Sequence, residues 1–144
     1  MAVYVEIGRC IGCRSCEVAC QREHAGYGHI SLQKMDHASV PVLCHHCEEP
    51  LCAAVCFTGA LQKDGNRTSL DVAKCTGCGL CQLACPFGAI RSERIAYKCD
   101  LCHEREVPVC VQTCPAEALS IDPMPAAVRA RMRAARGLSR GGGH

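Results

Sequence analysis

The chain has 144 residues, of which 16 are cysteine, five are Phe or Tyr and none is Trp. Large apolar side chains are too few to build the core of such a domain alone, so the chain without metal is expected to be largely unfolded. The net charge of +2 argues against a strongly basic nucleic-acid-binding protein. The start shows no export signal and no apolar run reaches about 18 residues, so we expect a cytoplasmic, reduced protein with no membrane span and no disulfide scaffold.

The cysteines fall into four sets of four, and these sets organise the rest of the sequence. Sets one and three have the spacing C-x2-C-x2-C-x3-C, and sets two and four widen the middle gap. Set three ends in Cys85-Pro86, which completes the run of a bacterial [4Fe–4S] ferredoxin. In chain order the sets are Cys10, Cys13, Cys16, Cys20; Cys44, Cys47, Cys52, Cys56; Cys75, Cys78, Cys81, Cys85; and Cys99, Cys102, Cys110, Cys114.

Short elements are predicted around these sets. Residues 3–7 alternate in polarity as a strand does. The last two cysteines of each set are spaced i, i+4 and share a helix face, which predicts helices at residues 15–23, 51–56, 80–85 and 109–114. A return pattern, Cys-x3-Ala-Leu or Cys-x3-Ala-Ile, follows three sets, and it predicts hairpins at residues 60–71 and 89–97. Residues 21–27 are polar and are predicted to form a loop.

The spacing leaves two groupings of the sets open. In two-cluster ferredoxins the fourth cysteine of a run binds the other cluster. The eighteen residues between Cys56 and Cys75 suit one hairpin, so sets two and three are predicted to pair inside sets one and four. Sequential pairing is the alternative. The nested layout predicts an α+β, ferredoxin-like fold of two interleaved two-cluster modules with short helices and β-hairpins: an outer module of residues 1–41 and 88–122 around an inner module of residues 42–87.

A basic tail, residues 123–144, follows the last set. It carries five Arg and no acid, and Pro125 and Gly137 are placed to open and close a helix. A solvated helix and docking on a partner or on an acidic face of the modules both remain open. The apolar stripe is too narrow for stable contact with a membrane surface.

The residues around sets two and four carry a resemblance to a known family. The segment Val42-Leu-Cys44-His-His-Cys47-Glu-Glu-Pro50-Leu-Cys52 resembles the second group of the four-cluster iron–sulfur subunits of molybdenum and tungsten oxidoreductases, and Lys98-Cys-Asp-Leu-Cys102 is similar to their fourth. The match covers about residues 3–122. It implies four [4Fe–4S] clusters, held by Cys10, Cys13, Cys16 and Cys114; Cys44, Cys47, Cys52 and Cys85; Cys75, Cys78, Cys81 and Cys56; and Cys99, Cys102, Cys110 and Cys20.

The resemblance also implies a function. The chain is expected to be a non-catalytic subunit that relays single electrons between a catalytic subunit with a tungsten or molybdenum pterin and a flavin subunit that meets NAD. It looks most like the small subunit of tungsten-dependent aldehyde oxidoreductases, with companions of carbon monoxide dehydrogenase, formate dehydrogenase and hydrogenase as alternatives. The nested layout gives the chain two different ends, so head-to-tail association of copies is a further expectation.

Two other classes of function compete with the relay. A structural zinc module also uses C-x2-C pairs, but three cysteines in one short loop do not suit a tetrahedral zinc site. An iron–sulfur regulator would need a DNA-binding motif, and we see none in the sequence.

Smaller expectations concern residues beside the ligands. Gly12, Gly77 and Gly79 are expected to let backbone N–H groups point at cluster sulfur. His45 and His46 are expected to be solvated or hydrogen-bonded and not to ligate, and His24, His29, His37 and His103 are expected to lie at the surface. The apolar residues expected to pack on the clusters are Ile11, Val18, Val55, Leu83, Ile90, Leu101 and Val111.

Overall fold

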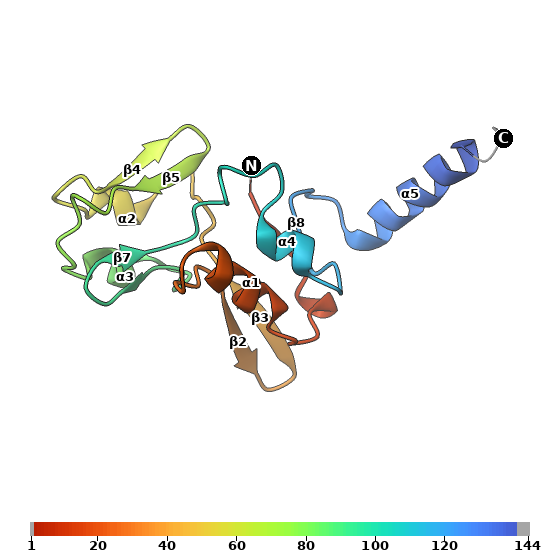
Figure 1. Ribbon diagram of the computed structural model, residues 1–144, viewed down its shortest axis with the longest axis horizontal. Helices are drawn as coiled ribbons and strands as arrows, with labels where there is room; N and C mark the ends of the chain where they lie inside the picture. Colours follow the sequence, from red (N-terminus) through yellow and green to blue (C-terminus); the bar gives the residue numbers. More distant parts are fainter. Residues whose placement is uncertain (1, 141–144) are drawn as a thin grey trace.

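The computed structural model describes residues 2–140 as two small α+β lobes with a projecting helix (Figure 1). The helices are η1 (Ile7–Arg9), α1 (Ser15–Glu23), α2 (Leu51–Ala54), α3 (Leu80–Ala84), α4 (Val109–Thr113) and α5 (Ala126–Arg140). The strands are β1 (Tyr4–Val5), β2 (Ser31–Met35), β3 (Ala38–Val42), β4 (Leu61–Asp64), β5 (Arg67–Leu70), β6 (Arg91–Ser92), β7 (Ala96–Tyr97) and β8 (Leu119–Ser120). The α+β class is confirmed, as are helices at all four predicted places.

One lobe joins the two ends of the cysteine-containing sequence. Strand β1 pairs with β8 in antiparallel register, so Val5 lies opposite Leu119. Helix α1, from the first cysteine set, packs on α4, from the fourth. Figure 1 shows α1, α4 and β8 together in this lobe. The first and last sets are therefore neighbours in space although about ninety residues of sequence separate them.

The other lobe is built from the middle of the chain. Helix α2 packs on α3, and the hairpins β4–β5 and β6–β7 lie beside them (Figure 1). Leu61, Ile90 and Ala96 form its core with Cys81. Since Ile90 and Ala96 pack here, this lobe extends past residue 87 to the β6–β7 hairpin. The interleaved modules and their limits stay predictions, and this packing favours a boundary closer to Lys98.

The hairpin β2–β3 is an element that the sequence reading missed. It pairs Ser31 with Val42 and Met35 with Ala38, around the two-residue turn Asp36-His37. Two polar residues between two five-residue segments were the available signal. The hairpin takes the place of the return pattern that the first cysteine set lacks.

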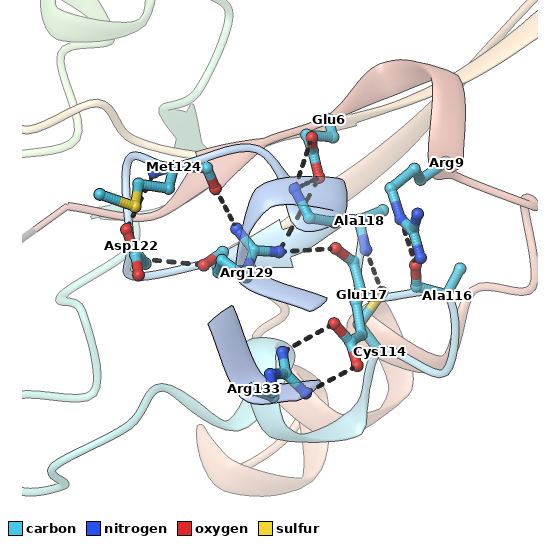
Figure 2. Close-up of polar contacts among 12 residues, drawn as sticks. Glu6, Arg9, Cys114, Ala116, Glu117, Ala118, Asp122, Met124, Arg129 and Arg133 are labelled. Atoms are coloured by element: carbon cyan, nitrogen blue, oxygen red, sulfur yellow. Dashed lines mark hydrogen bonds and ion pairs between the residues drawn. The ribbon is translucent and has the colours of Figure 1, made fainter. Parts of the chain in front are cut away.

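The basic tail docks at its first two turns and then projects from the lobe (Figure 1). The Ala126 N–H donates to both carboxylate oxygens of Glu6 at 3.0 Å, which caps the start of α5. Arg129 lies 3.8 Å from Glu6, and Arg133 forms an ion pair of 2.9 Å with Glu117. Figure 2 shows these contacts beside Cys114. The first half of helix α5 is therefore docked on acidic side chains of the outer lobe.

The prediction that Gly137 ends this helix is wrong. Helix α5 runs through Gly137 to Arg140, because a helical glycine costs only about 1 kcal/mol relative to alanine. Residues 141–144 of the predicted tail lie outside the described residues. None of the helices in residues 2–140 has the length and apolar character needed to cross a membrane.

A buried lysine joins the two lobes. Lys98 is only 4% exposed, and its Nζ donates to the backbone oxygens of Thr68 at 2.6 Å and Cys99 at 2.8 Å. Thr68 lies on β5, and Lys98 directly precedes the fourth cysteine set. The ammonium group therefore ties the middle lobe to the segment that returns to the outer lobe.

Replacing this lysine by methionine is expected to destabilise the protein. Lys98→Met leaves two buried carbonyl oxygens without a charged donor, which costs about 2–4 kcal/mol. The measurement is guanidinium denaturation of the cluster-loaded protein followed by far-UV circular dichroism. Lys34→Met, at an exposed position of β2, is the matched control and should stay within about 0.5 kcal/mol of the parent. Equal midpoints for the two variants would contradict this role of Lys98.

Candidate metal centres

Four cysteines from opposite ends of the sequence line one small cavity in the outer lobe. Cys10, Cys13 and Cys16 come from the loop before α1 and from its first turn. Cys114, which directly follows α4, completes the lining. Three thiols of one set and the last thiol of another therefore face the same space. The nearness of Cys114 is also one of the influences that raise the pKa of Cys16, after burial.

A second cavity in the middle lobe repeats this arrangement. Cys75, Cys78 and Cys81 of the third set line it together with Cys56, the last cysteine of the second set. Leu61 and Leu70 of the β4–β5 hairpin complete the apolar side of the cavity. The α2–α3 packing brings these two sets together.

Electrostatic neighbours relate the remaining cysteines. Burial raises the pKa of Cys52, and the nearby Cys44 and Cys85 raise it further. Burial also raises the pKa of Cys110, with added contributions from Cys99, Cys20 and Cys102. Cys47, the second cysteine of the second set, is half-buried, and its backbone oxygen accepts a hydrogen bond from the Lys63 ammonium. Each of these neighbourhoods contains cysteines of two sets. Cys16, which is not in the predicted quartet of Cys110, also raises the pKa of Cys110. The grouping into four clusters stays a prediction, which these placements support.

Backbone N–H groups surround the cysteine sulfurs. Ala89 donates to Cys85 at 3.4 Å and Ala118 donates to Cys114 at 3.3 Å, in both cases four residues on. The return pattern Cys-x3-Ala thus has a chemical purpose, because its alanine N–H points at the fourth sulfur. Further donors among the described residues reach Cys20, Cys44, Cys75 and Cys99 from His29, His46, Ala96 and Leu101 at 3.2–3.4 Å.

The donor set fits an iron–sulfur cluster. Burial raises the pKa of Cys16 to about 11 and that of Cys99 to about 12, so these thiols stay protonated in the metal-free chain at neutral pH. A bound metal deprotonates a coordinating thiol outright. The N–H groups already aimed at sulfur then stabilise the resulting thiolates. Buried thiol quartets with such donors have the ligand chemistry that [4Fe–4S] clusters require.

Gly77 and Gly79 of the third cysteine loop have the positive φ angles that glycine adopts easily, and the expectation that their N–H groups point at cluster sulfur stays a prediction. Gly77 has φ +74°, and a Cβ placed there would lie 2.0 Å from the backbone oxygen of Arg94. Gly79 has φ +78° with open space around it. The loop of the third set therefore approaches the β6–β7 turn so closely at Gly77 that a side chain does not fit.

Gly77→Ala is expected to cost the protein far more than Gly79→Ala. Both variants carry the left-handed backbone cost of about 1–2 kcal/mol, but only the first must also displace the β6–β7 turn. Gly77→Ala should therefore bind less iron, since Ala96 of the adjoining strand supplies the N–H that reaches Cys75. Iron per chain and thermal denaturation of both variants check this. Equal loss in the two would mean that backbone strain alone decides.

The expectation that seven apolar residues cover the clusters is wrong for three of them. Ile90 and Leu101 are buried and Val111 is half-buried, as expected. The three that face solvent are Val18, Val55 and Leu83, of which Leu83 is 84% exposed. Ile11 is exposed too, but it lines the cavity of Cys10, Cys13, Cys16 and Cys114. The helices form a single layer over the thiols, so their outer faces meet solvent.

The histidines divide into two groups. His46 is buried, and its Nδ1 accepts the Thr68 N–H at 3.1 Å. Burial lowers its pKa to about 3, so it stays neutral. His45 is exposed, and its ring stacks on that of Phe87 with centroids 3.9 Å apart. His37 and His103 are exposed, but His24 and His29 are half-buried and stack on one another, which the sequence reading missed.

Comparison with known proteins decides the family. Residues 35–123 match the family described as 4Fe-4S dicluster domain, and residues 7–28 match a 4Fe-4S binding domain. The chain belongs to the 4Fe-4S dicluster domain family. The two matched ranges contain all sixteen cysteines between them. This dicluster-domain protein is therefore a ferredoxin-type iron–sulfur electron-transfer protein.

Relatives of the dicluster-domain protein differ in size. The putative electron transport protein YsaA of Escherichia coli is 36% identical, over 91% of this chain and 95% of its own length. Formate hydrogenlyase subunit 2 of the same organism is 32% identical, over 78% of this chain and 76% of its own length. The putative oxidoreductase UacF of E. coli is 36% identical over 83% of this chain. The chain spans only 21% of the length of UacF.

Proposed function

We propose that the chain is a non-catalytic subunit that carries electrons through four [4Fe–4S] clusters with nested ligation. The observation that carries the proposal is the composition of the two cysteine cavities. Each holds three cysteines of one set and the last cysteine of another, Cys114 in the outer lobe and Cys56 in the middle lobe. By the same rule Cys85 completes the quartet of Cys44, Cys47 and Cys52, and Cys20 completes that of Cys99, Cys102 and Cys110.

In this proposal the protein holds the clusters, keeps water away from their ligands and directs N–H groups at the sulfur atoms. When bound, each [4Fe–4S] cluster accepts and releases one electron at a time. Ile90 and Leu101 keep water from the thiols on their inner side. The N–H groups of Ala89 and Ala118 stabilise negative charge on sulfur.

Two cysteines reach the surface and suit exchange with partners. Cys13 is exposed in the outer lobe and Cys78 is exposed in the middle lobe, whereas the other fourteen are buried or half-buried. The exposed apolar Ile11 lies near Cys13, and Leu80 near Cys78. A partner that covers these residues brings its own redox group close to a ligand. We therefore propose that partners exchange electrons with the chain at the surface around Cys13 and at the surface around Cys78.

The proposed catalytic partner carries a tungsten or molybdenum pterin. The tungsten-dependent aldehyde oxidoreductase type is the first candidate, with a flavin subunit linked to NAD at the other end. It rests on the resemblance in sets two and four. A non-catalytic role agrees with the absence of a Ser/His/Asp arrangement or a nucleotide-binding motif from the sequence.

A second candidate has its own supporting observation. Formate hydrogenlyase subunit 2 is a relative with 32% identity over most of its length. This similarity favours a complex that oxidises formate or handles hydrogen. The two candidates differ in the metal and in the substrate of the partner.

Affinity purification of the tagged chain from its native cells, under anaerobic conditions, tests both candidates. The proposal expects about sixteen irons per chain, a reducible paramagnetic signal and a copurifying pterin subunit. Tungsten with aldehyde oxidation supports the first candidate, and formate oxidation or hydrogen production supports the second. Colourless protein with zinc would overturn the relay in favour of the structural zinc module.

Mass photometry of the same complex tests head-to-tail association of copies. A complex with one chain per catalytic subunit would exclude that association.

A further inference from the structure

The turn after α1 brings an imidazole to the sulfur of a cysteine from the opposite end of the sequence. His24 Nε2 lies 3.8 Å from Cys102 Sγ and 3.6 Å from a carboxylate oxygen of Asp100. The His24 side chain is only 16% exposed. Cys102 belongs to the fourth set, 78 residues away in sequence. The contact is therefore a product of the fold and has no signal in the sequence.

Several contacts hold this imidazole in place. Its ring stacks on that of His29 with centroids 4.1 Å apart. The backbone N–H of His29 in turn donates to Cys20 Sγ at 3.2 Å. The preceding residue, Glu23, accepts two bonds from the Arg105 guanidinium at 2.6 and 2.8 Å. The turn is thus tied to the segment after Cys102 on one side and to Cys20 on the other.

The charged and polar groups around the imidazole affect how easily a cluster bound at this place is reduced. Asp100 accepts the Cys102 N–H at 2.9 Å, and its charge raises the pKa of both Cys102 and Cys20. A negative charge at this place opposes the arrival of an electron on a cluster bound there. An N–H group aimed at sulfur has the opposite effect, because it stabilises the additional charge of the reduced form. His24 Nε2 faces both the Asp100 carboxylate and the Cys102 sulfur, and the three groups lie within 4.8 Å of one another.

We propose that His24 is a positioning residue that donates its Nε2–H to the Cys102 sulfur and raises the reduction potential of the cluster at that sulfur. The proposal rests on the proposed function, in which Cys20, Cys99, Cys102 and Cys110 hold one cluster. Asp100 and His24 then set this potential jointly, and the stack on His29 fixes the donor. The other three clusters have no part in this contact, so one potential of four depends on His24.

Three variants of the full chain, loaded with clusters, test the role of the donor. His24→Leu removes the N–H and keeps an apolar side chain of similar reach. His24→Gln places an amide nitrogen near the position of Nε2 and keeps the donor. His37→Leu, at the exposed β2–β3 turn, is the matched control. Redox titration followed by electron paramagnetic resonance should give one midpoint shifted to lower potential in His24→Leu, and unshifted midpoints in the other two.

A second measurement covers the case in which His24→Leu loses iron. Protein labelled with ¹⁵N only in the imidazole rings of histidine should give a weak hyperfine coupling to the reduced cluster, and His24→Gln should lose that coupling while it keeps the midpoint. A coupling strong enough for direct ligation, no coupling lost in His24→Gln, or unshifted midpoints in a fully loaded His24→Leu would each overturn the proposal. Failure of the proposed function looks different, because the parent protein itself would then lack about sixteen irons and the four midpoints.

Discussion

Removing iron from the purified protein will abolish its folded state. The apolar core is too small to hold the chain without the inorganic links. Half of the ten residues in the main core cluster are cysteines. Ile30, Leu43, Leu101 and Leu119 are its only large aliphatic members among the described residues. A domain is stable by only about 5–15 kcal/mol, so the loss of the cross-links made by the clusters exceeds what these side chains supply.

The metal-free chain also has a poorly compensated interior. Burial raises the pKa of Cys99 to about 12, so its thiol remains neutral once the metal has left. A neutral thiol is a weak partner for the N–H of Leu101, which lies 3.4 Å from it. Several backbone donors therefore lose a charged acceptor together with the cluster, and water competes for them.

The measurement is far-UV circular dichroism and amide NMR dispersion before and after anaerobic treatment with a chelator and ferricyanide. The expected result is the loss of both the helical signal and a cooperative thermal transition. Reconstitution with iron, sulfide and thiol should restore them, whereas addition of zinc alone should not. A chelated chain that keeps dispersed amide signals and a sharp transition would contradict the argument.

The local pattern predicted the helices well for a simple reason. The two cysteines that close each set are four residues apart, and only a helical turn places them on one face. All four helices follow, and α1 has the predicted bounds of Ser15 and Glu23. Ligand spacing is a strict constraint, and it leaves a clear trace in the sequence.

Contacts between distant segments left no such trace. The pairing of β1 with β8 involves two residues on each strand, too few to show a period. The stacking of His24 on His29 depends on the turn at Ala25 and Gly26, both of which have positive φ. Leu83 was misjudged because the outer face of helix α3 meets solvent. Spacing therefore predicted the helices around the cysteine sets, while the surroundings of the cysteines needed the tertiary structure.

Serine substitutions on helix α2 and just after it will separate nested from sequential ligation. Cys52 and Cys56 are one helical turn apart and belong to the same set. Nested ligation places them in different clusters, because Cys52 lies near Cys44 and Cys85 while Cys56 lines the cavity of Cys75, Cys78 and Cys81. Sequential pairing, of set one with set two, also separates them but places Cys56 with Cys10, Cys13 and Cys16. Cys56→Ser should therefore change the same signal as Cys75→Ser under nested ligation, and the same signal as Cys10→Ser under sequential ligation. Serine keeps an oxygen at each position, so each variant should alter one cluster without emptying the lobe.

The expected result is that Cys52→Ser and Cys56→Ser each change a different one of the four redox-resolved paramagnetic signals, by loss or by a large shift in midpoint. Cys44→Ser is the matched control, because both groupings assign Cys44 and Cys52 to the same cluster, and it must change the signal that Cys52→Ser changes. Only the Cys56 variant then distinguishes the groupings, and a signal that it shares with Cys10→Ser would contradict the nested layout. If all three variants alter one common signal, the last cysteine of the set does not cross to its neighbour, and the nested layout of the whole chain is lost with it.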